Sequence, residues 1–215
     1  AEAADPRRSA HRPRIADRRA HPGDDLVSAL CTAEIDGDRL TDDEITGFLF
    51  LMVVAGNETT TKLLAHAWYW AWRNPDERAK AFADPSRIGD WVEETLRYDT
   101  SSQMLARVTR VPVELHGQVL PPGERVLLLV GAANRDPAHF DDPDEFRLDR
   151  ANSKGHMTFG KGAHFCLGAP LARLEAMTVL PMLLERTSWL DAADVGAWLP
   201  SVLARRRESL HLVVQ

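Results

Sequence analysis

A cysteine inside a glycine-rich segment is the residue of this sequence best suited to do chemistry. The segment reads Phe-Gly-Lys-Gly-Ala-His-Phe-Cys-Leu-Gly over residues 159–168, with Cys166 just before a predicted helix. Glycines permit a tight bulge that a flat ligand can approach, and a thiolate at a helix N-terminus is stabilised by the helix dipole and free backbone N–H groups. A thiolate so placed suits iron, although a buried structural cysteine explains Cys166 alone equally well.

A run of small and polar residues lies in the middle of an otherwise apolar predicted helix. It consists of Ala55, Gly56, Asn57, Glu58 and Thr59. An acid and a hydroxyl are costly to bury unless they are used, and the small residues make room for a ligand against the helix. A functional groove and a helix kink with internally satisfied side chains both agree with this pattern.

Glu94 and Arg97 form a third feature, three residues apart on a predicted helix. Side chains at this spacing are neighbours on one face, and an exposed pair of this kind contributes roughly a few tenths of a kcal/mol. By itself the pair predicts an ordinary ion pair on a helix surface.

The elements expected to position these residues are mostly helices with a few strands. We therefore predict a mainly α chain with a small β-sheet, an α+β fold. The longest helix is expected over 41–74, where Thr41 is a suitable N-cap and the apolar middle predicts burial on several sides. A long ordered loop is expected over 134–168, and such a loop is uncommon unless it is functional. Further helices are predicted over 75–82, 87–98 and 169–186, and strands over 111–115, 126–130 and 210–214. The helix over 87–98 is expected to carry an apolar stripe of Trp91, Val92, Thr95 and Leu96.

Composition and charge indicate a water-soluble globular protein. The net charge of −6 argues against a nucleic-acid backbone as partner, since phosphates call for lysine and arginine. No apolar run reaches the roughly 18 residues that a membrane span needs. Two cysteines are too few for a disulfide framework and fit a cytoplasmic protein. Six arginines near the start predict either a basic patch or a solvated face: Arg7, Arg8, Arg12, Arg14, Arg18 and Arg19.

The cysteine segment resembles a known family. Its pattern F-G-x-G-x-H-x-C-x-G is similar, letter for letter, to the haem-binding loop of bacterial cytochromes P450. The run from Ala55 to Thr60 resembles the A-G-x-D/E-T-T oxygen-binding groove of the same family. The resemblance implies that Cys166 is the axial ligand of haem b and that Ala55 and Gly56 face its distal side. It further implies that Thr59 holds dioxygen and a water while Glu58 relays protons.

The resemblance also gives roles to residues outside these two segments. In the family the Glu94–Arg97 pair is buried and joined by a second arginine, for which Arg150 is the best match and Arg135 the alternative; the spacing does not decide between them. Further cofactor-binding residues implied by the family are Arg107 and His164 for the haem propionates, Phe159 beside the thiolate, and Gly160 and Gly168 in the loop.

The implied activity is that of a class I haem-thiolate monooxygenase. Such an enzyme takes electrons from ferredoxin and ferredoxin reductase and inserts one atom of O2 into a small, mostly apolar substrate. The alternatives are a haem-thiolate peroxygenase and a catalytically silent fragment or partner protein. We expect residues 1–215 to form the carboxy-terminal part of a single cytochrome P450 domain whose amino-terminal half is absent, with self-association through the surface so exposed. The resemblance assigns activity to the parent enzyme rather than to these residues alone, and it names no substrate.

Overall fold

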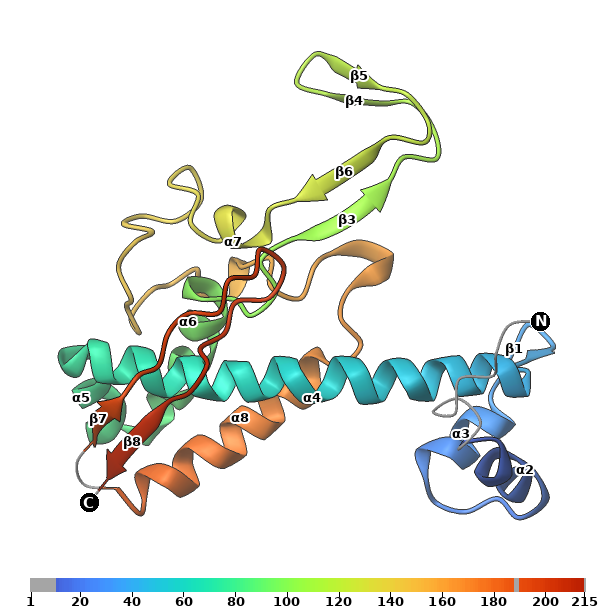
Figure 1. The fold of residues 1–215 in the computed structure, drawn as a ribbon, viewed down its shortest axis with the longest axis horizontal. Coiled ribbons are helices and arrows are strands. Elements are labelled where there is room, and N and C mark those ends of the chain that lie inside the picture. Colours follow the sequence, from blue (N-terminus) through green and yellow to red (C-terminus); the bar gives the residue numbers. More distant parts are fainter. Residues whose placement is uncertain (1–10, 188–189, 215) are drawn as a thin grey trace. The chain divides into compact units, whose positions relative to one another are not determined.

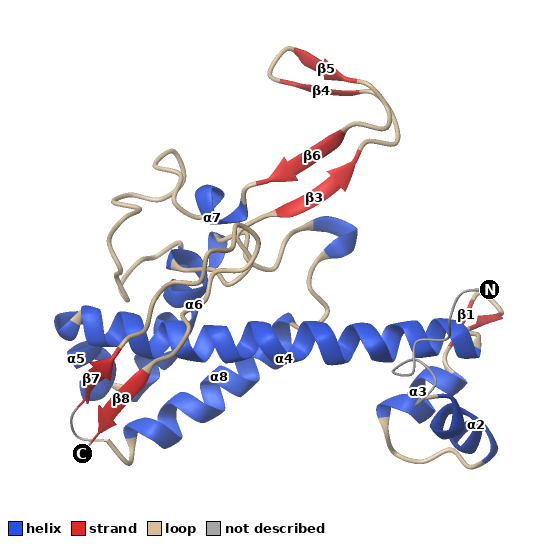
Figure 2. Ribbon diagram, viewed as in Figure 1, coloured by secondary structure: helices blue, strands red, loops and turns tan. Residues whose placement is uncertain are grey.

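A computed structural model describes residues 11–187 and 190–214. Figure 2 shows a mainly helical chain with strands arranged in pairs, which confirms the predicted α+β class. The chain divides into two compact units, one ending at Glu58 and the other beginning at Thr59. Each unit is described by itself below.

The first unit is built around two short helices and a small hairpin. Helix α2 covers Arg12–Ala20 and α3 covers Leu26–Thr32, while β1 (Glu34–Ile35) pairs with β2 (Asp38–Arg39). Helix α3 begins where the Asp25 carboxylate accepts a hydrogen bond from the Ser28 N–H at 2.8 Å, an N-cap contact. The core of this unit consists of Ile15, Val27, Cys31 and Ile45.

Each described arginine of α2 has an acidic partner within this unit, and Arg12, Arg14 and Arg19 remain exposed. Arg12 lies 2.7 Å from Asp43, and Arg19 lies 2.7 Å from Asp42. Arg14 and Arg18 both lie near Asp25, Arg18 at 2.7 Å. Pairing offsets the local positive charge, which argues against a basic patch, while the 63% and 60% exposure of Arg12 and Arg14 agrees with a solvated face. Arg7 and Arg8 lie outside the described residues.

Helix α4 covers Asp42–Arg73, as predicted. Its start is a capping box: the Thr41 hydroxyl accepts from the Glu44 N–H at 3.3 Å, and the Glu44 carboxylate accepts from the Thr41 N–H at 2.8 Å. Ile45 is buried in the first turn, and Leu63, Ala67 and Trp68 are buried in the later turns. The expected burial on several sides fails in the middle turns, where Leu51, Val53 and Val54 are exposed.

The core of the second unit lies where α4 meets two other helices. Helix α6 covers Ile88–Tyr98 and α8 covers Ala169–Leu184, and Trp91 of α6 packs edge to face on Trp68 at 5.5 Å. The predicted apolar stripe of α6 is buried in full, whereas α8 turns small residues such as Ala176 inward. Helix α5 (Pro75–Ala83) and the 3₁₀ turn η1 (Pro85–Arg87) join α4 to α6.

The strands of the second unit form separate two-stranded ladders. Figure 1 shows that the chain leaves the β3–β6 ladder to form the β4–β5 ladder beyond it. The two central strands predicted to share a sheet therefore lie in different ladders. The reason is a turn at His116 and Gly117, whose positive φ values of 48° and 78° fold the first strand onto its immediate successor. The pairs are β3 (Leu105–Val108) with β6 (Arg125–Leu128), β4 (Val113–Leu115) with β5 (Gln118–Leu120), and β7 (Leu190–Asp194) with β8 (His211–Val214).

The segment from Asn134 to Gly168 is largely irregular, as predicted. It follows the short helix α7 (Val130–Ala133) and contains two single 3₁₀ turns, η2 (Ser153–Gly155) and η3 (Gly162–His164). Within the described residues, no helix combines the length and apolar character needed to cross a bilayer.

Candidate functional site

The cysteine loop is closed on itself by backbone hydrogen bonds. The Cys166 N–H donates to the Phe159 carbonyl at 2.9 Å, so the two ends of the glycine-rich segment are held together. Gly160 and Gly162 have φ values of 69° and 74°, in the left-handed region that favours glycine. The spacing of glycines in the sequence is therefore required by the backbone turns that bring Cys166 to the end of the loop.

Cys166 is exposed, which argues against the structural alternative left open by the sequence. The buried cysteine of this chain is Cys31, in the core of the first unit. Helix α8 begins directly after the loop and has no side-chain cap at Gly168, so its first N–H groups are not occupied by a capping side chain. A side chain at Gly168 would approach the Cys166 sulfur to 3.9 Å, so glycine keeps this side of the sulfur open.

The two residues expected to bind propionates lie at exposed positions on different elements. His164 closes η3 in the cysteine loop, and Arg107 lies on β3 with its guanidinium donating to the Ala106 carbonyl at 2.9 Å. In the described part of the chain they form no hydrogen bond or ion pair with each other. Phe159 is half-buried at the base of the loop, against the edge of the helical core.

The predicted oxygen groove lies on consecutive turns of α4. All four residues predicted to act in the groove are exposed: Ala55, Gly56, Glu58 and Thr59. The sequence predicted a buried acid and hydroxyl here, and this burial is not found in the described chain. A methyl group placed on Gly56 would meet no atom within 4 Å, so the helix surface there is open. Helix α4 is continuous through this segment, from Asp42 to Arg73.

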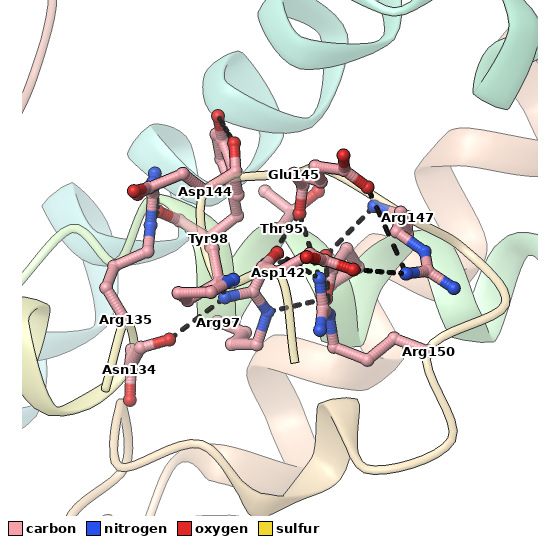
Figure 3. Close-up of polar contacts among 12 residues, drawn as sticks. Thr95, Arg97, Tyr98, Asn134, Arg135, Asp142, Asp144, Glu145, Arg147 and Arg150 are labelled. Atoms are coloured by element: carbon pink, nitrogen blue, oxygen red, sulfur yellow. Dashed lines mark hydrogen bonds and ion pairs between the residues drawn. The ribbon is translucent and has the colours of Figure 1, made fainter. Parts of the chain in front are cut away.

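Glu94 and Arg97 are not a surface pair: both side chains are fully buried. Their contact is bidentate, at 2.8 Å from Arg97 Nε and 2.7 Å from Nη2. The other Arg97 donors reach backbone carbonyls of the irregular segment, which Figure 3 shows wrapped around the guanidinium. These acceptors are Asn134 at 3.0 Å, Pro143 at 2.9 Å and Glu145 at 2.9 Å.

The structure brings Arg150, rather than Arg135, to Glu94. Arg150 Nε lies 3.2 Å from a Glu94 carboxylate oxygen, and its remaining donors reach the carbonyls of Asp141, Asp142 and Glu145. Arg135 instead stacks 3.6 Å over the Tyr98 ring and pairs with the exposed carboxylate of Asp144. Figure 3 shows the two arginines on opposite sides of Arg97.

Asn134 connects this buried network to the cysteine loop, a role the sequence did not reveal. Its side chain is fully buried and accepts from the Met157 N–H at 2.7 Å while donating to the Thr158 hydroxyl at 3.0 Å. Thr158 in turn donates to the Leu96 carbonyl of α6 at 2.6 Å. The residues just before Phe159 are thereby fixed to α6, and no local pattern in the sequence marks an asparagine for that task.

Glu93 is a second buried carboxylate that sequence reasoning missed, next to Glu94 on α6. It accepts from Arg173 of α8 at 2.5 and 3.0 Å, and it lies 3.2 Å from the His156 ring. Burial opposes its ionisation, but the hydrogen bonds from His156 and Arg173 outweigh burial and lower the pKa of Glu93 to about 2. The carboxylate is therefore charged over the whole physiological range.

Comparison with known proteins agrees with the resemblance in the cysteine loop. A family model described as Cytochrome P450 matches residues 90–201. The Putative cytochrome P450 123 of Mycobacterium tuberculosis is 59% identical over 180 residues, which is 84% of this chain and 45% of that protein. The structure of CYP109Q5 from Chondromyces apiculatus superposes with a TM-score of 0.92 at 39% identity, covering 97% of this chain and 54% of that one.

A third similar protein is CYP109E1 from Bacillus megaterium in complex with testosterone. It has a TM-score of 0.91 and 36% identity, and the match covers 98% of this chain and 58% of that one. The chain thus spans about half the length of the relatives it matches.

Proposed function

Because the chain belongs to the cytochrome P450 family, we propose that it supplies the haem-thiolate part of a monooxygenase, with the thiolate of Cys166 on the iron of haem b. The observation that carries this proposal is an exposed thiol held at the start of α8 by the bond from the Cys166 N–H to the Phe159 carbonyl. The residues on either side of it, Phe165 and Leu167, are 51% and 71% exposed, so the loop presents two apolar side chains next to the cysteine. An open soft donor among apolar side chains fits a flat, apolar macrocycle.

Haem bound there would supply the one-electron and dioxygen chemistry that side chains cannot perform. His164 and Arg107 would bind the propionates, and the planar fork of arginine suits a carboxylate. Phe159 would shield the sulfur from water, while Gly160 and Gly168 keep the backbone close to the ligand. The exposed positions of His164 and Arg107 leave both side chains available for this binding.

Proton delivery is assigned to α4. Glu58 would take up a proton from solvent, and the Thr59 hydroxyl would hold dioxygen and a water and pass the proton on, which is general acid catalysis. Ala55 and Gly56 would make room for the distal ligand. The open space at Gly56 supports this assignment.

For the whole protein we propose a cytoplasmic enzyme that receives two electrons from ferredoxin through ferredoxin reductase. One atom of O2 would enter a small, mostly apolar substrate, and the other would leave as water. The complex of CYP109E1 with testosterone supports an apolar substrate class. A peroxygenase remains the second candidate, because the exposed loop would serve that chemistry equally.

The ligand assignment is tested by the absorption spectrum of haem-loaded, reduced protein with carbon monoxide. We expect the Soret band typical of thiolate-ligated haem, and we expect Cys166→Ala to abolish it. Cys31→Ala is the matched control, because that thiol is buried and points to the Ile15 carbonyl at 3.9 Å. The absence of a thiolate band in haem-loaded wild-type protein, or its persistence in Cys166→Ala, would refute the assignment.

The proton-delivery assignment is tested by Thr59→Ala in the whole protein, with Thr61→Ala one half-turn away as control. With the electron-transfer partners, Thr59→Ala should divert electrons into hydrogen peroxide. With added peroxide as the oxidant, product formation should persist. Equal peroxide release by both variants would contradict a role for the Thr59 hydroxyl.

A further inference from the structure

Two neighbouring carboxylates of α6 hold different parts of the chain. Glu94 binds Arg97 and Arg150 and so fixes the segment around residues 142–150. Glu93 binds His156 and Arg173, which lie on either side of the cysteine loop. Helix α6 therefore contacts the chain three residues before Phe159 and again seven residues after Cys166.

The hydrogen bonds around Glu93 have defined donors and acceptors, and the Glu93 and His156 side chains are buried. The His156 Nδ1 accepts from the Thr158 N–H at 3.2 Å, so the hydrogen-bond network assigns the ring proton to Nε2, which donates to Glu93. A neutral imidazole satisfies both contacts. The side chains of Glu93 and His156 are 7% and 2% exposed, and that of Arg173 is 33% exposed.

Arg173 also reaches the cysteine loop itself. Its guanidinium lies 4.6 Å from the centre of the Phe159 ring, and Phe159 is the residue whose carbonyl accepts from the Cys166 N–H. The positive charge of Arg173 therefore lies against the residue whose carbonyl closes the loop at Cys166.

We propose that Glu93 and Arg173 form a positioning pair for the cysteine loop: together they tie both ends of the loop to α6 and set the balance of charge beside Cys166. The first half of this statement concerns the chain alone. The second half rests on the proposed haem site, because the charge balance would act on the iron. The pair touches no reacting atom and works through Phe159 and the loop backbone.

The positioning half is tested on haem-free protein by limited trypsin digestion. Lys161 is an exposed cleavage site inside the loop, and the rate of cleavage there reports how often the loop opens. Glu93→Gln and Arg173→Gln should each speed cleavage after Lys161 by about tenfold or more. Glu34→Gln and Arg39→Gln, taken from an exposed ion pair, are the charge-matched controls. Cleavage no faster than in the controls would overturn the proposal.

The charge half is tested by the reduction potential of haem-loaded protein. Arg173→Gln leaves a negative charge unbalanced and should lower the potential, whereas Glu93→Gln leaves a positive charge and should raise it. Arg173→Lys keeps the charge but loses the planar stack, so its potential should stay near that of wild type while its loop opens faster. Shifts of the same sign in both glutamine variants would refute the charge role. If wild-type protein bound no haem, the function proposed above would fail, and the digestion would still decide the positioning role.

Discussion

Replacing Arg150 with methionine removes one cation from the buried network around Glu94. The Arg150 side chain is 4% exposed, and its loss removes a donor from the carbonyls of Asp141, Asp142 and Glu145, of which Glu145 keeps its bond from Arg97. Removing one partner of a buried ion pair typically costs about 3 to 5 kcal/mol. Because Glu94 keeps its bidentate contact with Arg97, we expect the lower end, about 3 kcal/mol.

Arg135→Met is the matched control, since the sequence left Arg135 as the alternative to Arg150. Arg135 is 28% exposed and its acidic partner Asp144 is 86% exposed, so screening by water leaves a loss of about 1 kcal/mol. The measurement is urea unfolding of the chain, monitored by far-ultraviolet circular dichroism. The free energies of unfolding are compared for variants whose dependence on urea concentration, the m-value, is unchanged.

A double-mutant cycle with Glu94→Gln isolates the contact itself. Arg150→Met and Glu94→Gln should couple by about 1 kcal/mol or more, as groups in one network do, whereas Arg135→Met and Glu94→Gln should be nearly additive. Equal losses for the two methionine variants, or additivity at Arg150, would refute the assignment of Arg150 to the network.

Three further changes probe other parts of the chain. Burial lowers the pKa of His66 below its usual 6.5, so wild-type stability should fall as pH drops below about 6.5, and urea unfolding of His66→Gln should show a smaller fall over that range. Thr41→Ala removes the capping box of α4 and should cost about 1 kcal/mol, measured as a lower urea midpoint that Thr41→Ser largely restores. Asn134→Ala leaves the Met157 N–H without its acceptor, so the free energy of unfolding should fall by about 2 kcal/mol. Trypsin should also cleave faster at Lys161, and unchanged cleavage would contradict the link from Asn134 to the loop.

Local patterns in the sequence predicted the parts of the fold that depend on neighbouring residues. The start of α4 at Thr41, the buried stripe of α6 and the irregular segment after α7 all follow from capping, periodicity and turn composition. The strands were harder, because pairing is decided by turn geometry: the positive φ at His116 pairs β4 with β5, and β3 is left to pair with β6.

The candidate site divides in the same way. Cys166 and its glycines are contiguous, so their spacing carried the whole signal. Glu93 and Arg173 lie 80 residues apart, Asn134 and Met157 lie 23 residues apart, and each pair meets only in the folded structure. Nothing near Arg150 or Arg135 could decide which of them reaches Glu94, since that choice depends on the path of residues 141–150 around α6.

The saturated guanidinium of Arg97 has a consequence for the order of folding. Its backbone acceptors lie 37, 46 and 48 residues along the chain, so these bonds form only after long loops have closed. Because contacts between residues so far apart are costly to form early, we expect a weakening of these bonds to accelerate unfolding and to leave the refolding rate nearly unchanged. On this expectation, Arg97 affects the lifetime of the folded chain more than the speed of its formation.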